Sequence, residues 1–139
     1  MKYLLDTNIV SEISKKKPNL NVLAWLDRIT LAESSISVMT IGELRRGIEL
    51  VSDEIRRARL ETWYQDNVRV SFAGRTLNLD DRVMECWGER MAALSRQGLS
   101  IEPLDGLIGA TALVHGLTLV TRNTDHFLAF GISLENPWQ

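Results

Sequence analysis

The sequence has few of the residues on which several common classes of protein depend. Its 139 residues include one cysteine, Cys86, and two histidines, His115 and His126. One thiol cannot build a disulfide framework, and the lack of an HExxH motif or a histidine cluster disfavours a zinc site. No apolar run approaches the ~20 residues that cross a bilayer, and Asp6 interrupts the first apolar stretch too early for a signal peptide. We therefore expect a cytoplasmic protein without a membrane-spanning segment.

An excess of charge of one sign is also missing. The formal net charge is −2, which argues against a strong non-specific nucleic-acid binder, because such binding depends on many Lys and Arg contacts to phosphates. The basic residues nevertheless gather in short runs at Lys15–Lys17, Arg45–Arg46 and Arg56–Arg59. Each run taken alone is best interpreted as a solvated helix surface, with a phosphate-facing patch as the alternative.

The length suits one domain over residues 1–139, and we find no repeat, linker or low-complexity tract. Apolar runs predict strands at 2–5, 35–38, 75–79, 117–121 and 132–134. Helical spacing of apolar residues predicts helices at 8–15, 20–32, from 40 onward, 53–68, from Asp80 to near Gly98, and 104–115. Apolar strands that alternate with helices indicate an α/β fold with a parallel sheet covered on both faces.

Four acids follow the predicted strands closely. Asp6 comes directly after the first strand, Glu43 lies in the helix after the second, Asp105 begins the apolar helix, and Asp125 follows the strand that ends at Thr121. In a parallel sheet the functional crevice lies beyond the carboxyl ends of the strands. We therefore expect these acids to face one edge of the sheet.

Each acid also has a structural interpretation. Asp6 and Asp105 suit helix caps, Glu43 suits an ion pair with one of the arginines in GELRR, and Asp125 suits a turn. Their convergence favours a ligand role, because carboxylates within ~4 Å of each other repel by several kcal/mol per pair at an effective dielectric near 20. A cation would relieve this repulsion, and oxygen ligands without cysteine suit Mg²⁺ or Mn²⁺.

Hydroxyl and amide side chains accompany the acids. Thr7, Asn8, Thr40 and Thr121 are placed to orient waters or phosphate oxygens, and capping or turn chemistry is the alternative. For Thr7 and Thr40 we favour that alternative.

The motifs LLDTN, SVMTIGELRRG, PLDGLIGATALVHGLTLVTRNTDHF and the closing ENPW occur in this order along the whole chain. Together they resemble a PIN-domain ribonuclease, in particular the toxins of VapBC/FitAB-type toxin–antitoxin modules. The resemblance implies a PIN-like three-layer sandwich with a central parallel β-sheet flanked by α-helices. It also implies that Asp6, Glu43 and Asp105 are the core acids around Mg²⁺ or Mn²⁺, with Asp6 and Asp105 as direct ligands.

The region after Thr121 departs from the family's pattern. Thr121 and Asn123 match the polar cluster after the fourth strand, but many relatives carry an acid two residues after that threonine or directly before the phenylalanine. Here those positions hold Asn123 and His126, with Asp125 between them. Asp125 could supply the fourth acid through a local shift, Asn123 could be a neutral ligand, or the site could work with three acids.

The resemblance further implies an endoribonuclease that acts as a toxin on a structured RNA such as a tRNA. A divalent cation suits this chemistry, because it lowers the pKa of the attacking water and stabilises the developing charge. The implied partners are a small VapB/FitA-like antitoxin, which inserts a segment across the acidic pocket, and a second copy in a homodimer. Apolar stripes on the helices at 20–32 and 40–68 would form the antitoxin groove.

Other functions compete with this hypothesis. A degenerate nuclease fold retained for binding would explain the irregular fourth acid. A dehalogenase-type phosphatase needs a second aspartate where Asn8 stands, and a response-regulator receiver needs an acidic pair where the first strand is followed only by Asp6. Phosphotransfer is therefore the weaker alternative.

Overall fold

A computed structural model, which describes residues 1–139, contains a five-stranded sheet in the order β3-β2-β1-β4-β5. All four strand pairings are parallel. The strands are β1 (Tyr3–Leu5), β2 (Ser34–Ser37), β3 (Thr76–Leu77), β4 (Thr118–Val120) and β5 (Leu134–Glu135). The parallel sheet predicted from the alternation of strands and helices is therefore confirmed.

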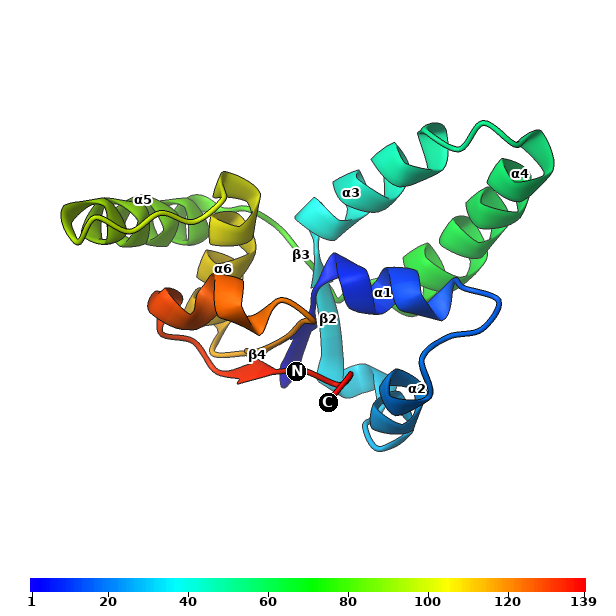
Figure 1. Ribbon diagram of the computed structural model, residues 1–139, viewed down its shortest axis with the longest axis horizontal. Coiled ribbons are helices and arrows are strands. Elements are labelled where there is room, and N and C mark those ends of the chain that lie inside the picture. Colours follow the sequence, from blue (N-terminus) through cyan, green and yellow to red (C-terminus); the bar gives the residue numbers. More distant parts are fainter.

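Helices cover both faces of the sheet and complete three layers (Figure 1). Figure 1 shows α5 and α6 on one side, with α1, α3 and α4 on the other. The α-helices are α1 (Thr7–Ile13), α2 (Leu20–Asp27), α3 (Val38–Glu49), α4 (Glu54–Trp63), α5 (Asp81–Arg96) and α6 (Pro103–His115). The shorter elements are 3-10 helices η1 (Leu31–Glu33) and η3 (Thr124–Phe130) and a π-helix, η2 (Tyr64–Arg69). No helix combines the length and apolar character needed to cross a membrane.

The core is divided by the sheet, because successive side chains of a strand point to opposite faces. Tyr3 and Leu5 of β1 belong to a cluster with residues of α1, α2, α3 and η2. Leu4, between them, packs instead in a cluster with Ile108 of α6. β1 is thus buried on both faces, which places the residue that follows it at the centre of one sheet edge.

Several predicted boundaries differ from the structure. The helix predicted over 20–32 ends at Asp27, because Thr30 is extended and its side chain and Glu33 cap a separate turn. The helix predicted over 53–68 changes into η2 after Trp63. The last strand lies at Leu134–Glu135 rather than 132–134. The apolar spacing of the helix predicted over 53–68 makes Ile55 a candidate packing residue, but Ile55 is 85% exposed.

Candidate active site

Asp6 lies at the carboxyl end of the central strand and is 7% exposed. β1 lies between β2 and β4 and is parallel to both. The segments that follow these three strands therefore begin at the same edge of the sheet. Asp6 Oδ1 accepts the Thr7 N–H at 2.8 Å, and Asp6 Oδ2 accepts the Thr121 hydroxyl at 2.8 Å. Asp6 is therefore the N-cap of α1 and also a carboxylate facing the edge, so the two interpretations of this residue are compatible.

The surroundings of Asp6 disfavour its charge. Burial is the main cause that raises the pKa of the Asp6 carboxyl, and the negative charges of Glu43 and Asp105 raise it further. The hydrogen bonds from Thr121 and Thr7 act in the opposite direction, but the net pKa is raised. The charges of Glu43 and Asp105 thus act on Asp6 across the edge.

Thr121 connects the ends of β1 and β4. It is fully buried, and besides donating to Asp6 its hydroxyl oxygen accepts the Asn8 side-chain amide at 3.3 Å and the Asn123 N–H at 3.1 Å. The Thr121 hydroxyl therefore directly orients Asp6. Asn8 also accepts the Arg122 N–H at 3.3 Å, which ties α1 to the segment after β4.

Glu43 is brought to the site by a threonine rather than by an arginine. The Thr7 hydroxyl donates to Glu43 Oε1 at 2.7 Å and lies 2.9 Å from the Thr40 hydroxyl. Since Thr7 has one hydroxyl proton, donation to Glu43 makes Thr40 the donor in the second bond. The prediction that Thr7 and Thr40 serve in capping or turns is wrong, because Asp6 caps α1 and Ser37 caps α3. The two hydroxyls instead bond each other, and Thr7 bonds Glu43.

The alternative ion pair for Glu43 is also wrong. Arg45 instead binds Glu61 through two hydrogen bonds of 3.0 and 2.8 Å, and it contacts Glu49 at 3.2 Å. Neither Arg45 nor Arg46 forms a salt bridge with Glu43.

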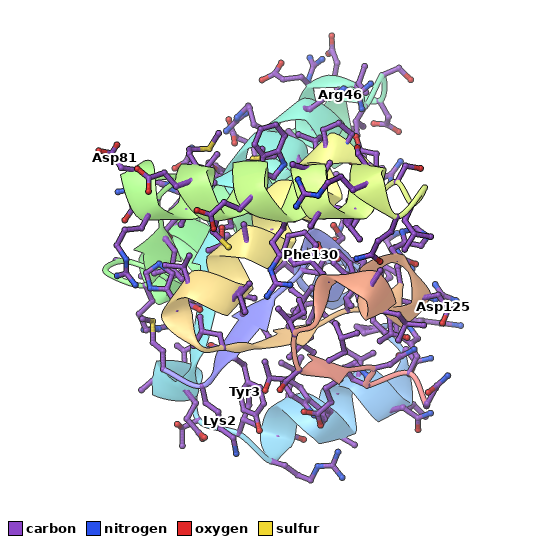
Figure 2. All side chains as sticks on the ribbon, turned by 90° about the vertical axis from the view of Figure 1, so that its left-hand side faces the viewer. Lys2, Tyr3, Arg46, Asp81, Asp125 and Phe130 are labelled. Carbon is purple, nitrogen blue, oxygen red and sulfur yellow. The ribbon has the colours of Figure 1, made fainter.

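Asp105 lies in the first turn of α6, but the cap of that helix is Glu102, which accepts two N–H groups there. The cap interpretation of Asp105 is therefore wrong. Its Oδ2 lies 3.3 Å from His126 Nδ1 in η3. Asp125 is exposed, and it forms no side-chain hydrogen bond or ion pair; Figure 2 shows it at the outer edge of the molecule.

Asp6, Glu43 and Asp105 offer carboxylate oxygens as ligands and have no Lys or Arg partner; the one basic side chain in contact with them is His126, whose Nδ1 lies 3.3 Å from Asp105 Oδ2. This donor set fits a hard divalent cation. As the side chains stand, however, no three of the His, Cys, Asp and Glu residues lie close enough to share one metal ion. Mg²⁺ commonly keeps several waters and uses one or two carboxylates, so a cation held partly through waters fits this arrangement.

The links through Thr7 and Thr40 were missed by the sequence reasoning. Thr7 and Glu43 are 36 positions apart, and their contact depends on how α1 crosses the start of α3. The signal that could have found them is the presence of a hydroxyl residue immediately after Asp6 and another three positions before Glu43.

Comparison with known proteins agrees with this architecture. The sequence profile of the PIN domain matches residues 3–131. The chain is 36% identical over 135 residues to Toxin FitB of Neisseria gonorrhoeae, covering 97% of each chain. It is 35% identical over 136 residues to VapC ribonuclease Y4jK of Sinorhizobium fredii, covering 98% of this chain and 97% of that one.

A solved structure supports the same relationship. The crystal structure of FitAcB from Neisseria gonorrhoeae superimposes with a TM-score of 0.94 and 36% identity, over 99% of each chain. β1 to β4 and the acidic edge fall within residues 3–131, and β5 follows them at Leu134–Glu135. PIN-domain ribonucleases in general depend on a divalent metal. The chain belongs to the PIN-domain family, with VapC ribonucleases and the FitB toxin among its relatives.

Proposed function

We propose that this chain is an endoribonuclease that hydrolyses RNA phosphodiester bonds with the help of Mg²⁺ or Mn²⁺. The observation that carries the proposal is Asp6, a buried carboxylate at the carboxyl end of the central strand, held by Thr121 and close enough to Glu43 and Asp105 for their charges to raise its pKa. Carboxylates without Lys or Arg partners at such an edge are suited to a divalent cation. A bound cation would lower the pKa of a water and stabilise charge on the phosphate.

The side chains divide into ligands and positioning groups in this proposal. Asp6 and Asp105 bind the cation, and Glu43 acts with them, held by the Thr7 hydroxyl. Thr121, Asn8 and Asn123 form one hydrogen-bonded group that orients Asp6 and the segment after β4. Asp125 is one of the open choices for the fourth position, beside Asn123 and a site of three acids, and the residue there that contacts Asp105 is His126.

We further propose that the protein is the toxin of a toxin–antitoxin pair, restrained by a VapB/FitA-like antitoxin. A groove of 270 Å³ between α1, α2 and η2 is lined by nine apolar residues among twelve, including Ile13, Leu31 and Trp63. Apolar side chains open to solvent at this place suit an amphipathic segment of a partner. The acidic edge is suited to a basic residue of the same partner.

The remaining parts of the proposal concern organisation. Residues 1–139 act as a single PIN domain, and the hydrogen bond of 2.6 Å that Trp25 of α2 donates to Glu135 of β5 supports this, since it joins segments 110 positions apart. A homodimer is the expected assembly in the absence of antitoxin. We expect the activity in the cytoplasm, because the proposed substrate is a cellular RNA such as a tRNA.

The nuclease proposal is tested with purified, antitoxin-free protein, RNA, and either Mg²⁺ or EDTA. We expect cleavage in Mg²⁺, none in EDTA, and a loss of about 100-fold or more in Asp6→Asn and Asp105→Asn, since each removes a proposed ligand. Sequencing of the RNA ends after expression of the wild type and Asp6→Asn would identify the target. Cleavage that persists in EDTA or in both variants would exclude the mechanism. A folded protein that binds RNA but never cleaves it would favour the degenerate, binding-only PIN fold.

The groove is tested separately. Leu31→Asp places a charge in the groove and should weaken antitoxin binding by about tenfold or more, because a charge buried without a partner is strongly disfavoured. Leu99→Asp is a matched control, since Leu99 is 46% exposed and Leu31 is 52% exposed, but only Leu31 lines the groove. Equal effects in a pull-down of the antitoxin would show that the groove has no special role.

A further inference from the structure

Two basic runs that lie far apart in the sequence meet around one surface hollow. The hollow has a volume of 460 Å³ and lies between the loop after α1 and the first half of α4. Lys15 and Lys16 line it from the loop, and Arg56 and Arg59 line it from α4. Figure 1 shows α1 and α4 on the same side of the sheet. The sequence alone could not decide whether either run was more than solvated surface.

The positive charge of this hollow is largely uncompensated. Its lining contains four cationic side chains and one acid, Asp53. Asp53 Oδ1 is occupied with the N–H groups of Ile55 and Arg56 as the cap of α4. Among the four cations only Lys15 forms a salt bridge, to Glu12 at 2.8 Å. The net charge of the whole chain is −2, so this group of cationic side chains, three of them without a salt bridge, gives one part of the surface a positive charge.

The opposite face of α4 shows that this arrangement is not a general feature of the helix. A second hollow, between α3 and α4, is lined by Arg45 and Arg57 together with Glu49, Glu54 and Glu61. There Arg45 is paired with both Glu49 and Glu61. Arg56 and Arg59 are three positions apart and therefore share one helix face. One face of α4 therefore carries both acidic and basic side chains, whereas the other carries mainly basic ones.

The loop side of the hollow is held in place by a buried acid. Glu12 is 5% exposed and accepts both the Lys15 ammonium and the Asn19 N–H, the latter at 2.9 Å. The hydrogen bond from Lys15 is the main cause that lowers the pKa of the Glu12 carboxyl. Glu12 thereby fixes the start and end of the loop that carries Lys15 and Lys16.

We infer that Lys15, Lys16, Arg56 and Arg59 form a binding site for the phosphate backbone of RNA, separate from the acidic edge. This inference rests on the proposed function, which makes RNA the substrate. Without its cation the acidic edge repels phosphates, and cationic side chains elsewhere on the surface add to the attraction that a bound cation supplies. Lys and Arg at a hollow supply it, because neutralising phosphates releases the counterions condensed on the nucleic acid.

The position of the hollow suits nucleotides that flank the cleaved bond. α1 begins next to Asp6 and ends at the hollow, and its seven residues span about 10 Å. At about 3.4 Å per nucleotide, about three nucleotides cover this distance. Ile55, which is 85% exposed, adds an apolar surface among the cations that a ribose or base can contact.

The test measures binding of a fluorescently labelled, 20-nucleotide single-stranded RNA by anisotropy, in EDTA and at salt concentrations from 50 to 200 mM. The double variant Arg56→Gln/Arg59→Gln should bind about tenfold more weakly at 100 mM salt. Its slope of log affinity against log salt should be shallower by about 1.4, because each lost phosphate contact contributes about 0.7 on single strands. Arg57→Gln/Arg69→Gln removes the same charge outside the hollow and should change affinity less than about twofold.

The outcomes separate this inference from the nuclease proposal. If both double variants weaken binding equally, or if Arg56→Gln/Arg59→Gln binds like the wild type, the inference is wrong while Mg²⁺-dependent cleavage by the wild type still supports the nuclease. If a 20-residue polyglutamate peptide binds the hollow and the double variant binds RNA with the affinity of the wild type, the site binds an acidic protein segment instead. If the wild type neither binds nor cleaves RNA, both proposals fail.

Discussion

The hydroxyl of Thr121 donates a 2.8 Å hydrogen bond to Asp6 Oδ2, across 115 positions of sequence. The bond joins the ends of β1 and β4, which are neighbours in the sheet. The same oxygen accepts from Asn8 and Asn123, so one buried side chain fixes the orientation of the central carboxylate and of the segment that follows β4.

Replacing Thr121 with valine should lower nuclease activity by about 10- to 100-fold, because Asp6 loses the group that orients it. It should also lower the free energy of unfolding by about 1–3 kcal/mol, since the Asn123 N–H is left without its partner. Activity assays and urea unfolding measure the two effects. Thr121→Ser keeps the hydroxyl and should retain most of the activity. Equal losses in both variants would show that shape rather than the hydrogen bond matters.

Thr7→Val should separate Glu43 from the site. The substitution removes the donor to Glu43 and leaves the buried Thr40 hydroxyl unpaired, at a cost of about 1–3 kcal/mol in stability. We expect activity to fall about tenfold and to recover partly at higher Mg²⁺ concentration, because a misplaced acid weakens ion binding. Thr7→Ser is the control. Unchanged activity in Thr7→Val would remove Glu43 from the catalytic set or show that it needs no anchor.

The raised pKa of Asp6 predicts a pH dependence of stability without metal. Above the ordinary carboxyl pKa of 3.8 the folded protein keeps its proton longer than the unfolded chain, so the free energy of unfolding should fall as pH rises through the raised pKa. Asp6→Asn lacks this contribution. In EDTA, the melting temperature of the variant should therefore rise relative to wild type between pH 4 and pH 7. A constant difference over this range would contradict the prediction.

Addition of Mg²⁺ or Mn²⁺ should stabilise the wild-type protein. Binding to the folded state alone contributes about 2.7 kcal/mol when the free ion is at about 100 times its dissociation constant. Differential scanning fluorimetry should show a rise in melting temperature that EDTA reverses. The double variant Asp6→Asn/Asp105→Asn should show none. The same rise in both proteins would place the ion elsewhere on the surface.

Gly109 in α6 and Gly88 in α5 are two helix glycines outside the proposed set of site residues. A Cβ on Gly109 would lie 3.0 Å from the ring of Phe130, which Figure 2 shows beside α6, whereas a Cβ on Gly88 meets nothing within 4 Å. Gly109→Ala should destabilise by about 1–3 kcal/mol through overpacking. Gly88→Ala should stabilise by about 0.5–1 kcal/mol, because alanine is the better helix former. Urea unfolding of both variants measures the contrast.

The sequence was most informative where local periodicity and burial agree. Asp80, where the sequence predicts a helix to begin, is the N-cap of α5, and α6 ends at Gly116, whose backbone is left-handed at φ 64°. The sequence was least informative where a boundary depends on side chains from elsewhere. The end of α2 and the start of η2 are examples, because the capping and packing that decide them are not visible in a window of a few residues.

The sequence by itself determined that acids follow apolar strands of a parallel sheet, because strand periodicity and the carboxyl-end rule depend only on residue order. It could not assign the partners of those acids. Tertiary structure decided that Asp6 accepts a hydrogen bond from Thr121 and that Glu43 accepts one from Thr7. It also decided that Asp105 contacts His126. It also brought Lys15 and Arg56 to one hollow. The physical reason is that contacts over tens of residues are set by how whole helices pack against the sheet, and one sequence records only the patterns along each helix.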